Sequence, residues 1–185
     1  MSWPYGDVSD MSTSNNAHCE VAKAAIEAGK PFCLEKPVTL TAEEADILAK
    51  AAQEKGIPNM VCFSYRFKAA ARYAKELVEK GMLGDIYHVY MQYLQGGGGP
   101  SYDLPRSWRY QKKLTGTGAL GDLGCHALDL VSFVTGKNYR KAVGHTDTYV
   151  TQRRLEEGEG YGPVDVDDYC HYLVELDGTT TANFT

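Results

Sequence analysis

The first third of the chain alternates strand-like runs with helical segments, and this alternation constrains the fold more than any other feature. Strand-like runs occur at residues 7–12, 31–37 and 57–63, and helical segments at 13–30 and 41–56 separate them. Strands that alternate with helices of this length are typical of a parallel sheet with crossover helices. The sequence therefore predicts an α/β unit at the start of the chain.

Capping residues set the predicted helix boundaries in this part. Asn15 or Asn16 is expected to cap the first helix, and Gly29 is placed to end it. Thr41 and Glu44 have the spacing of a capping box, which predicts where the second helix begins. Both helices are therefore predicted with defined starts.

After Tyr65 the pattern changes to that of an α+β domain. Helices are expected in residues 68–84 and 119–135, and tyrosine- and valine-rich strands from residue 85 and from residue 141 onward. The glycine-rich stretch "GGGGPSYDLP" fits only a loop.

These patterns predict two domains. Residues 1–63 are expected to form the remnant of a Rossmann-type parallel sheet, and residues 64–185 an α+β domain with a largely antiparallel open sheet. The last strand reaches Thr185 without a turn after it, so we expect the chain to be a piece of a longer reading frame.

Composition excludes several classes of function. The net charge of -5 and the pI near 5.5 argue against a nucleic-acid surface, which needs clustered Lys and Arg. Five scattered cysteines with no C-x-x-C pair suggest neither a disulfide framework nor a zinc ribbon, and they fit a reducing cytoplasm. No apolar run approaches the roughly 20 residues of a membrane span, and no signal peptide is recognisable.

The stretch "LTGTGALGDLGCHALDL" contains Gly116, Gly118 and Gly121 in the spacing of a dinucleotide-binding loop. Such a loop needs a buried strand before it and an acidic residue about 20 residues after it. Here "WRYQKKLT" precedes the glycines and "NYRKAVGH" stands at the acidic position. We therefore interpret the glycines as the lead into a helix.

That helix carries Asp122 and His126, whose i, i+4 spacing places them on one face. A carboxylate beside an imidazole raises the pKa of the imidazole and fixes its tautomer, as proton transfer near neutral pH requires. Asp129 is a second candidate partner or a structural anchor. The alternative is that Asp122 caps the helix and His126 is a core histidine.

The turn "EKP", Glu35 to Pro37, follows a predicted parallel strand, where open α/β sheets bind ligands. Lys36 there would place a positive charge against a developing alkoxide or a cofactor ribose. The alternative is a solvated lysine at the end of a strand.

Three stretches, taken in order, resemble the Gfo/Idh/MocA family of NAD(P)-dependent oxidoreductases, which includes glucose-fructose oxidoreductase and inositol dehydrogenases. These stretches are "TSNNAHCEVAKAAIEAGKPFCLEKPVTLTAEEADILAKAAQEKGI", "SYRF" and "WRYQKKLTGTGALGDLGCHALDL". The resemblance extends from about Asp7 to Gly136. It departs from the family in lacking the pyrophosphate loop and first βα units, and in having Ser14 where the family's T-P-N-x-x-H turn has proline.

The resemblance implies the activity and the site. It implies hydride transfer between NAD or NADP and a secondary alcohol of a sugar, inositol or related polyol, in a homo-oligomer, dimer or tetramer, assembled through the open sheet. The implied catalytic residues are Lys36, Asp122 and His126. The implied cofactor-binding residues are Thr13, Asn15, His18, Glu35, Lys36 and Pro37, and the implied substrate-binding residues are Arg66, Trp108, Arg109 and Asp122.

Two other functions remain open from the sequence. The first is that the chain lacks activity and acts as an oligomerisation or binding module, which would not bind the cofactor. Metal-dependent hydrolysis through His18, Asp122, His126 or His171 is disfavoured, because no recognised ligand motif is present and no metal is expected.

Overall fold

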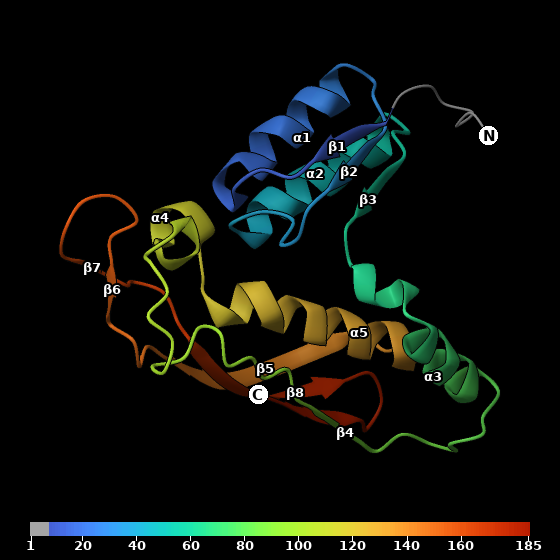
Figure 1. Ribbon diagram of the computed structural model, residues 1–185. Coiled ribbons are helices and arrows are strands. Elements are labelled where there is room, and N and C mark those ends of the chain that lie inside the picture. Colours follow the sequence, from blue (N-terminus) through green and yellow to red (C-terminus); the bar gives the residue numbers. More distant parts are fainter. Residues whose placement is uncertain (1–7) are drawn as a thin grey trace.

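The computed structural model describes residues 8–185 and shows two units joined through one short segment (Figure 1). The first unit is a three-stranded parallel sheet with two helices. The second is a four-stranded mixed sheet with one long helix lying across it. The expected combination of a Rossmann-like parallel sheet and an α+β domain is confirmed.

The first unit has the predicted strand and helix order. Strands β1 (Ser9–Met11), β2 (Phe32–Leu34) and β3 (Asn59–Val61) pair in parallel in the order β1-β2-β3. Helices α1 (His18–Glu27) and α2 (Ala42–Glu54) connect them. The start of the predicted first strand, Asp7, lies outside the described residues.

One cluster of apolar side chains holds this unit together. Alternate β2 residues and the inner faces of α1 and α2 supply it, because side chains three and four apart share a helix face. Its fully buried members are Cys19, Ala22, Ala25, Ile26, Phe32, Leu34, Leu48 and Ala52.

The helix caps agree with the sequence in one case and differ in the other. Oγ1 of Thr41 accepts from the amide of Glu44 at 3.2 Å, as the capping box requires. The prediction that Asn15 or Asn16 caps α1 is wrong. A 3-10 turn, η1 (Asn15–Ala17), precedes α1, and the N-cap residue makes no side-chain cap bond.

The second unit begins with η2 (Ser64–Phe67) and α3 (Ala69–Glu79), followed by strand β4 (His88–Met91). The predicted helix 119–135 opens with a turn of π-helix, η4 (Leu120–Gly124), and continues as α5 (Cys125–Thr135). Because the parallel sheet ends before η2 begins, we propose the domain boundary between residues 63 and 64.

The sheet of the second unit has the order β4-β9-β8-β5. Strands β5 (Tyr139–Asp147) and β8 (Tyr169–Leu176) are antiparallel, and so are β8 and β9 (Thr181–Phe184). Only β4 and β9 pair in parallel. The sheet is therefore mixed but largely antiparallel.

A smaller layer lies beside this sheet, and sequence patterns missed most of it. It contains η3 (Trp108–Tyr110), α4 (Lys112–Thr115), and a hairpin of β6 (Gln152–Arg154) and β7 (Tyr161–Pro163). These elements are too short and too polar to show a clear periodicity.

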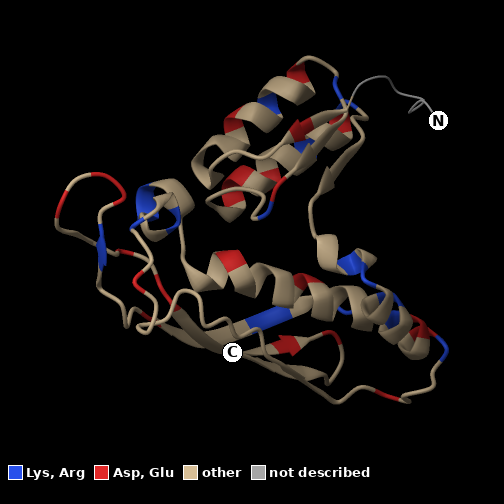
Figure 2. Ribbon diagram, in the orientation of Figure 1, with Lys and Arg blue, Asp and Glu red and all other residues tan. Residues whose placement is uncertain are grey.

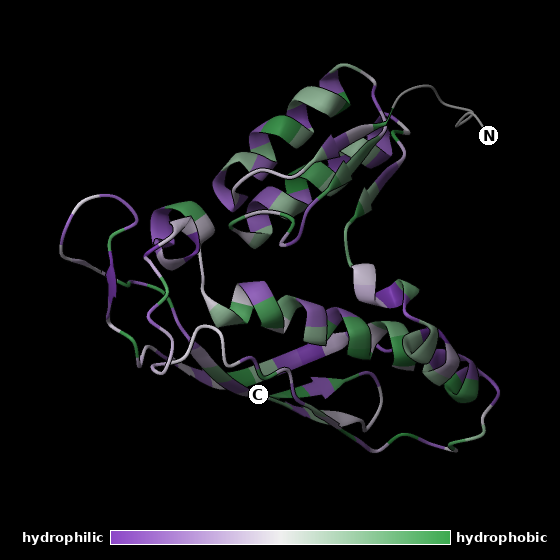
Figure 3. Ribbon diagram, in the orientation of Figure 1, coloured by the Kyte–Doolittle hydropathy of each residue, from purple (hydrophilic) through white to green (hydrophobic). Residues whose placement is uncertain are grey.

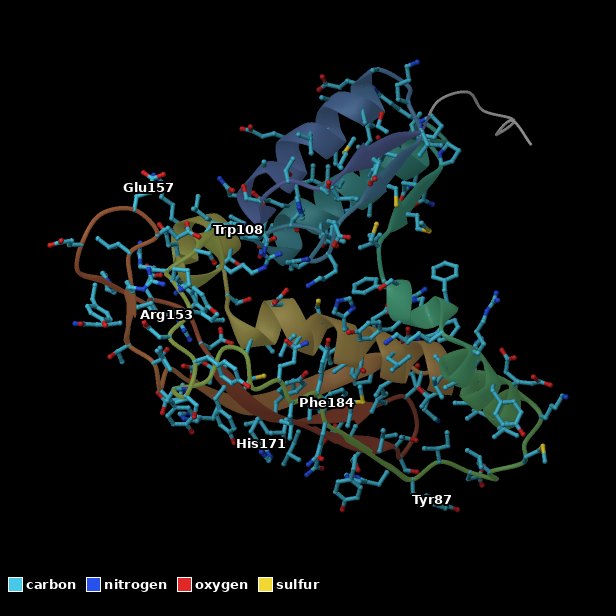
Figure 4. The ribbon with its side chains drawn as sticks, viewed as in Figure 1. Tyr87, Trp108, Arg153, Glu157, His171 and Phe184 are labelled. Carbon is cyan, nitrogen blue, oxygen red and sulfur yellow. The ribbon has the colours of Figure 1, made fainter. Side chains whose placement is uncertain are left out.

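Burial alternates along β8, which shows how α5 packs on the sheet. The β8 residues facing α5 are buried, and those between them are exposed on the opposite face. The ring of Phe184 stacks on Tyr172 with centroids 4.7 Å apart, and Figure 4 shows Phe184 between the sheet and α5. Figure 3 shows hydrophobic bands along α5 where this core forms.

Acidic and basic residues are interspersed over both units in Figure 2. Among residues 8–185, no helix is long and apolar enough to cross a bilayer.

Candidate active site

An ion pair joins the turn after β2 to the π-helical turn η4. Nζ of Lys36 lies 2.5 Å from Oδ1 of Asp122 and also donates to the backbone carbonyl of Asp122 at 2.9 Å. The Lys36 side chain is 15% exposed and that of Asp122 is 44% exposed. The "EKP" turn and the helix of the second unit therefore meet at these two residues, 86 positions apart in sequence.

A second polar contact joins the two units nearby. Nδ2 of Asn15 donates to the carbonyl of Thr115 at 3.0 Å and to its hydroxyl oxygen at 3.1 Å. Both residues are buried. Asn15 thus fixes the turn after β1 against α4, a structural contact that the sequence did not predict.

A cavity of about 520 Å³ lies at the carboxyl ends of β1 and β2, where open parallel sheets bind ligands. The turn after β1, the turn after β2, η3 and η4 all contribute to its wall. It brings together most of the residues assigned from the sequence. Its lining is Ser12, Thr13, Ser14, Asn15, Glu35, Lys36, Trp108, Arg109, Thr115 and Asp122.

A smaller cavity of about 210 Å³ adjoins the first on the side of the second unit. The two cavities share Arg109, Thr115 and Asp122. The smaller one is lined largely by the glycine-rich loop, η3 and the segment before β8, which contribute Gly98, Tyr110 and Asp167 among others. The ion pair of Lys36 and Asp122 therefore lies at the junction of two cavities.

His126 is buried on the face of α5 that lies under η2. Its ring stacks on Tyr65 with centroids 4.5 Å apart, and Phe63 approaches it edge-on at 6.1 Å. Nδ1 is sealed from solvent without a hydrogen-bond partner in the described part of the chain. Nε2 is not sealed in this way, so any proton exchange with a ligand is left to Nε2, although His126 lines neither of the two cavities.

The expected hydrogen bond between Asp122 and His126 does not form. The Asp122 carboxylate is bound by Lys36 instead. Burial lowers the pKa of His126 below 6.5, and the charge of Lys36 lowers it further, while Asp122 opposes both effects. Asp122 therefore acts on the pKa of His126 in the expected direction, but burial and the Lys36 charge outweigh it.

Arg66 and Asp129 form a separate ion pair on the far side of His126. Nε of Arg66 donates to Oδ2 of Asp129 at 2.8 Å, and Nη2 contacts Oδ1. The Asp129 side chain is only 7% exposed. Asp129 thus anchors η2 to α5, and Arg66 lines neither cavity.

His18 and Pro37 support the site without reaching the cavity. His18 is fully buried, Nδ1 donates to the carbonyl of Pro37 at 2.7 Å, and Nε2 lies 3.2 Å from the carbonyl of Thr13. The imidazole therefore links the turn after β1 to the "EKP" turn. Direct contact between His18 and a cofactor is not compatible with this burial.

The motif at Gly116 to Gly121 follows α4 rather than a strand, so it is not a pyrophosphate loop. The carboxylate of Asp167 already binds the amides of Gly118 and Leu120, at 2.8 and 2.6 Å. A Cβ at position 118 would overlap the carbonyl oxygen of Asp167. Glycine is therefore needed at position 118, because a side chain there would prevent Asp167 from packing against the start of the helix and binding its amides.

Two residues at the site were missed from the sequence. Asp167 holds the start of η4, and the "DVDD" run that contains it is a signal, since Asp side chains in loops bind backbone amides. Tyr65 covers the ring of His126, and nothing in the local sequence indicates this, because the contact spans 61 positions and depends on the packing of η2 on α5.

No cluster of three or more His, Cys, Asp or Glu residues fit for a metal occurs in the described range. His171 is an exposed residue of β8, on the face of the sheet opposite the buried β8 residues that pack on α5, and Figure 4 shows it at this outer face. Burial also raises the pKa of Cys125 to about 11, which keeps this thiol protonated.

A crevice at the carboxyl edge of a parallel sheet, next to a buried imidazole and a lysine, is the arrangement of a nucleotide-dependent oxidoreductase. Residues 7–63 match the family model described as an oxidoreductase family with an NAD-binding Rossmann fold. Residues 71–185 match the GFO/IDH/MocA C-terminal domain. The chain belongs to the Gfo/Idh/MocA family of oxidoreductases.

Known relatives share about half their length with this chain. Levoglucosan dehydrogenase of Pseudarthrobacter phenanthrenivorans is 38% identical over 181 residues, which cover 91% of this chain and 46% of the relative. The scyllo-inositol 2-dehydrogenase (NADP(+)) of Bacillus subtilis is 36% identical over 154 residues, covering 82% and 40%.

Solved structures agree with this relationship. An oxidoreductase domain protein from Kribbella flavida superimposes with a TM-score of 0.91 at 39% identity, covering 97% of this chain and 48% of the other. Levoglucosan dehydrogenase in complex with NADH gives a TM-score of 0.90 at 35% identity, covering 97% and 47%.

Proposed function

We propose that this chain forms the reaction part of an NAD(P)-dependent dehydrogenase that transfers hydride to and from a secondary alcohol of a sugar, inositol or related polyol. The contact between Lys36 and Asp122 carries this proposal. It places a positive charge and a carboxylate from different units at the junction of two cavities, one at the carboxyl edge of the parallel sheet and one in the second unit.

The larger cavity supports the assignment of the cofactor. Its wall is mainly polar, and its hydroxyl, amide and charged side chains suit a ribose and a nicotinamide carboxamide. Thr13, Asn15, Glu35 and Lys36 would hold the nicotinamide end there, with Trp108 on the opposite wall. When bound, the cofactor supplies the hydride acceptor.

His126 is proposed as the group that exchanges the hydroxyl proton. Its lowered pKa leaves the imidazole neutral near pH 7, the state a general base needs. Of its two nitrogens, Nε2 is the one that is not sealed within the protein. General base catalysis of this kind contributes roughly a hundred- to ten-thousand-fold.

Lys36 and Asp122 are proposed to act on the substrate oxygen and hydroxyl groups. The Lys36 ammonium would stabilise negative charge that develops on the oxygen as its proton leaves. Asp122 holds Lys36 in place, and its partly exposed carboxylate is free to accept from a neighbouring substrate hydroxyl. Arg109 is shared by both cavities and is a further candidate for binding the substrate.

Titration with NADH and NADPH tests the proposal. Excitation of Trp108, which lines the larger cavity, should give energy transfer to bound NADH, and Trp108→Phe should reduce this signal without abolishing binding. Saturable binding followed by turnover of a polyol in a panel supports the proposal. Absence of binding at millimolar cofactor would overturn it for this chain and favour a binding or oligomerisation module.

A further inference from the structure

Arg153 on β6 is a buried charge without a counter-charge. The residue is 3% exposed, and among the described residues no carboxylate lies within ion-pair distance of its guanidinium. Nε is sealed without a hydrogen-bond partner. Burying a charged group in this way is costly, so the contacts that Arg153 does make need an explanation.

Those contacts are with the wall of the smaller cavity. Nη2 of Arg153 donates to the carbonyl oxygen of Gly98, and the guanidinium carbon lies 4.1 Å above the centre of the Tyr110 ring. Gly98 and Tyr110 both line the smaller cavity, whereas Arg153 itself does not. Figure 4 shows Arg153 on the β6–β7 hairpin, on the same side of the molecule as Trp108 of η3.

The glycine-rich loop depends on such an outside contact. Gly96 to Gly99 have no side chains to anchor them, and glycine loses the most conformational freedom on ordering. Within residues 8–185, Arg153 is the only side chain that hydrogen-bonds to these four residues. The other hydrogen bonds of the loop are backbone bonds, from the amide of Gly99 to the carbonyl of Gly96 and from the amide of Tyr102 to the carbonyl of Gly99. The guanidinium of Arg153 is therefore the side chain that ties the loop to the hairpin.

Hydrogen bonds also join the hairpin that carries Arg153 to residues 106–112, which follow the glycine-rich loop in the chain. The amide of Arg106 donates to the carbonyl of Arg154 at 2.7 Å, and Nε of Arg106 donates to the carbonyl of Pro163 at 2.5 Å. The amide of Lys112 donates to Asp165 at 2.7 Å. The hairpin thus forms a rigid support from which Arg153 reaches the loop.

We propose that Arg153 is a positioning residue for the proposed polyol site. It orders the loop Gly96–Gly99 and the ring of Tyr110, and so sets the affinity for the polyol without touching it. This inference rests on the proposed function for its ligand, but the ordering of the loop can be measured without any ligand.

The test compares Arg153→Met and Arg153→Lys with Arg154→Met in the same strand. Arg154 is exposed, and its Nε lies 3.6 Å from Asp103, so this control removes an arginine from β6 without touching the cavity wall. Hydrogen exchange of the amides in residues 96–102 is expected to rise about tenfold in Arg153→Met and to stay unchanged in Arg154→Met.

Ligand binding supplies the second readout. The probe is whichever of levoglucosan, L-sorbose and scyllo-inositol binds the unaltered chain, measured by saturation-transfer NMR below the melting temperature. If the loop is in place about a tenth of the time without Arg153, the apparent dissociation constant rises about tenfold. Arg153→Lys keeps the charge but cannot stack and donate as a planar fork, so a substantial loss is expected there too.

A rescue variant separates positioning from simple loss of stability. The backbone at Gly97 is not left-handed, and a Cβ there would meet nothing within 4 Å. Gly97→Ala should therefore stiffen the loop and recover about two- to fivefold of the affinity lost in Arg153→Met.

The outcomes are distinct. Unchanged exchange at residues 96–102 in Arg153→Met would overturn the inference. So would a lowered melting temperature with unchanged affinity. Faster exchange in a chain that binds none of the three probes would support the ordering of the loop and count against the proposed polyol site.

Discussion

Lys36 and Asp122 face each other across the two units, with Nζ of the lysine 2.5 Å from Oδ1 of the aspartate. The Asp122 carboxylate therefore binds Lys36 rather than His126, which lies one helical turn further on. Burial and the Lys36 charge favour the neutral form of the imidazole, and they outweigh the opposing charges of Asp122, Glu35 and Asp129.

Opposite changes in the pKa of His126 are expected from removing each partner. Lys36→Met should raise this pKa, because a positive charge is lost and the Asp122 carboxylate remains. Asp122→Asn should lower it, because the opposing negative charge is lost. An NMR titration of the imidazole protons measures both. A shift of the same sign in the two variants would contradict the arrangement of charges described here.

Turnover is expected to depend on His126 far more than cofactor binding does. In a version of the protein that oxidises a polyol, His126→Gln should reduce kcat by roughly a hundred- to ten-thousand-fold. The dissociation constant for NADH should stay close to that of the unaltered protein, since His126 lines neither cavity. Stopped-flow and titration measure the two quantities. Preserved kcat would remove His126 from the mechanism.

The dependence of stability on pH follows from the lowered pKa of His126. Its ordinary value is 6.5 and its value in the folded chain lies below that, so the unfolded chain binds more protons between the two values. Stability from this residue is full above pH 6.5 and is lost as pH falls through that window. Melting temperatures of the unaltered chain and His126→Gln should therefore converge on acidification. A difference in melting temperature between the two proteins that stays constant with pH would argue against a lowered pKa of His126.

Gly118→Ala should destabilise the start of the helix that carries Asp122 and His126. The new Cβ would overlap the carbonyl oxygen of Asp167, a backbone atom in the segment before β8, so relief requires the backbone to shift. We expect the free energy of unfolding to fall by about 1–3 kcal/mol, the usual range for overpacking. Urea unfolding provides the measurement. Gly97→Ala is the control, since its Cβ meets open space, and an equal loss in both would count against the steric argument.

Assembly through the open sheet remains a prediction. One row of side chains crosses the four strands on the face away from α5. It consists of Val143, Leu173, Asn183 and Tyr90. Val143 and Tyr90 are 70% and 81% exposed. If this face joins two copies, Leu173→Lys should shift sedimentation towards monomer, because it places an unpaired charge in the contact. Tyr161→Ser, on the separate β6–β7 hairpin, should leave the mass unchanged.

The sequence by itself determined the class of fold and the approximate positions of its longer helices and of most strands in the two main sheets. Strands β2 and β8 and helices α2 and α5 carry their periodicity and capping signals locally, as Thr41 and Glu44 show. The sequence also indicated that Gly116 to Gly121 are not a phosphate loop, because the required strand is absent before them. Such features depend on residues within one or two turns of each other.

Only the tertiary structure decided the partners of the polar groups. Asp122 binds Lys36, Asn15 binds Thr115, and Arg153 reaches the glycine-rich loop, each across 55 or more positions. A local rule placed Asp122 beside His126 at i, i+4, but a lysine from another unit is a stronger partner for a carboxylate than a neutral imidazole is. The positions of the side chains near the proposed reaction site therefore depend on how the two units pack together, and the spacing of residues along the chain does not predict this.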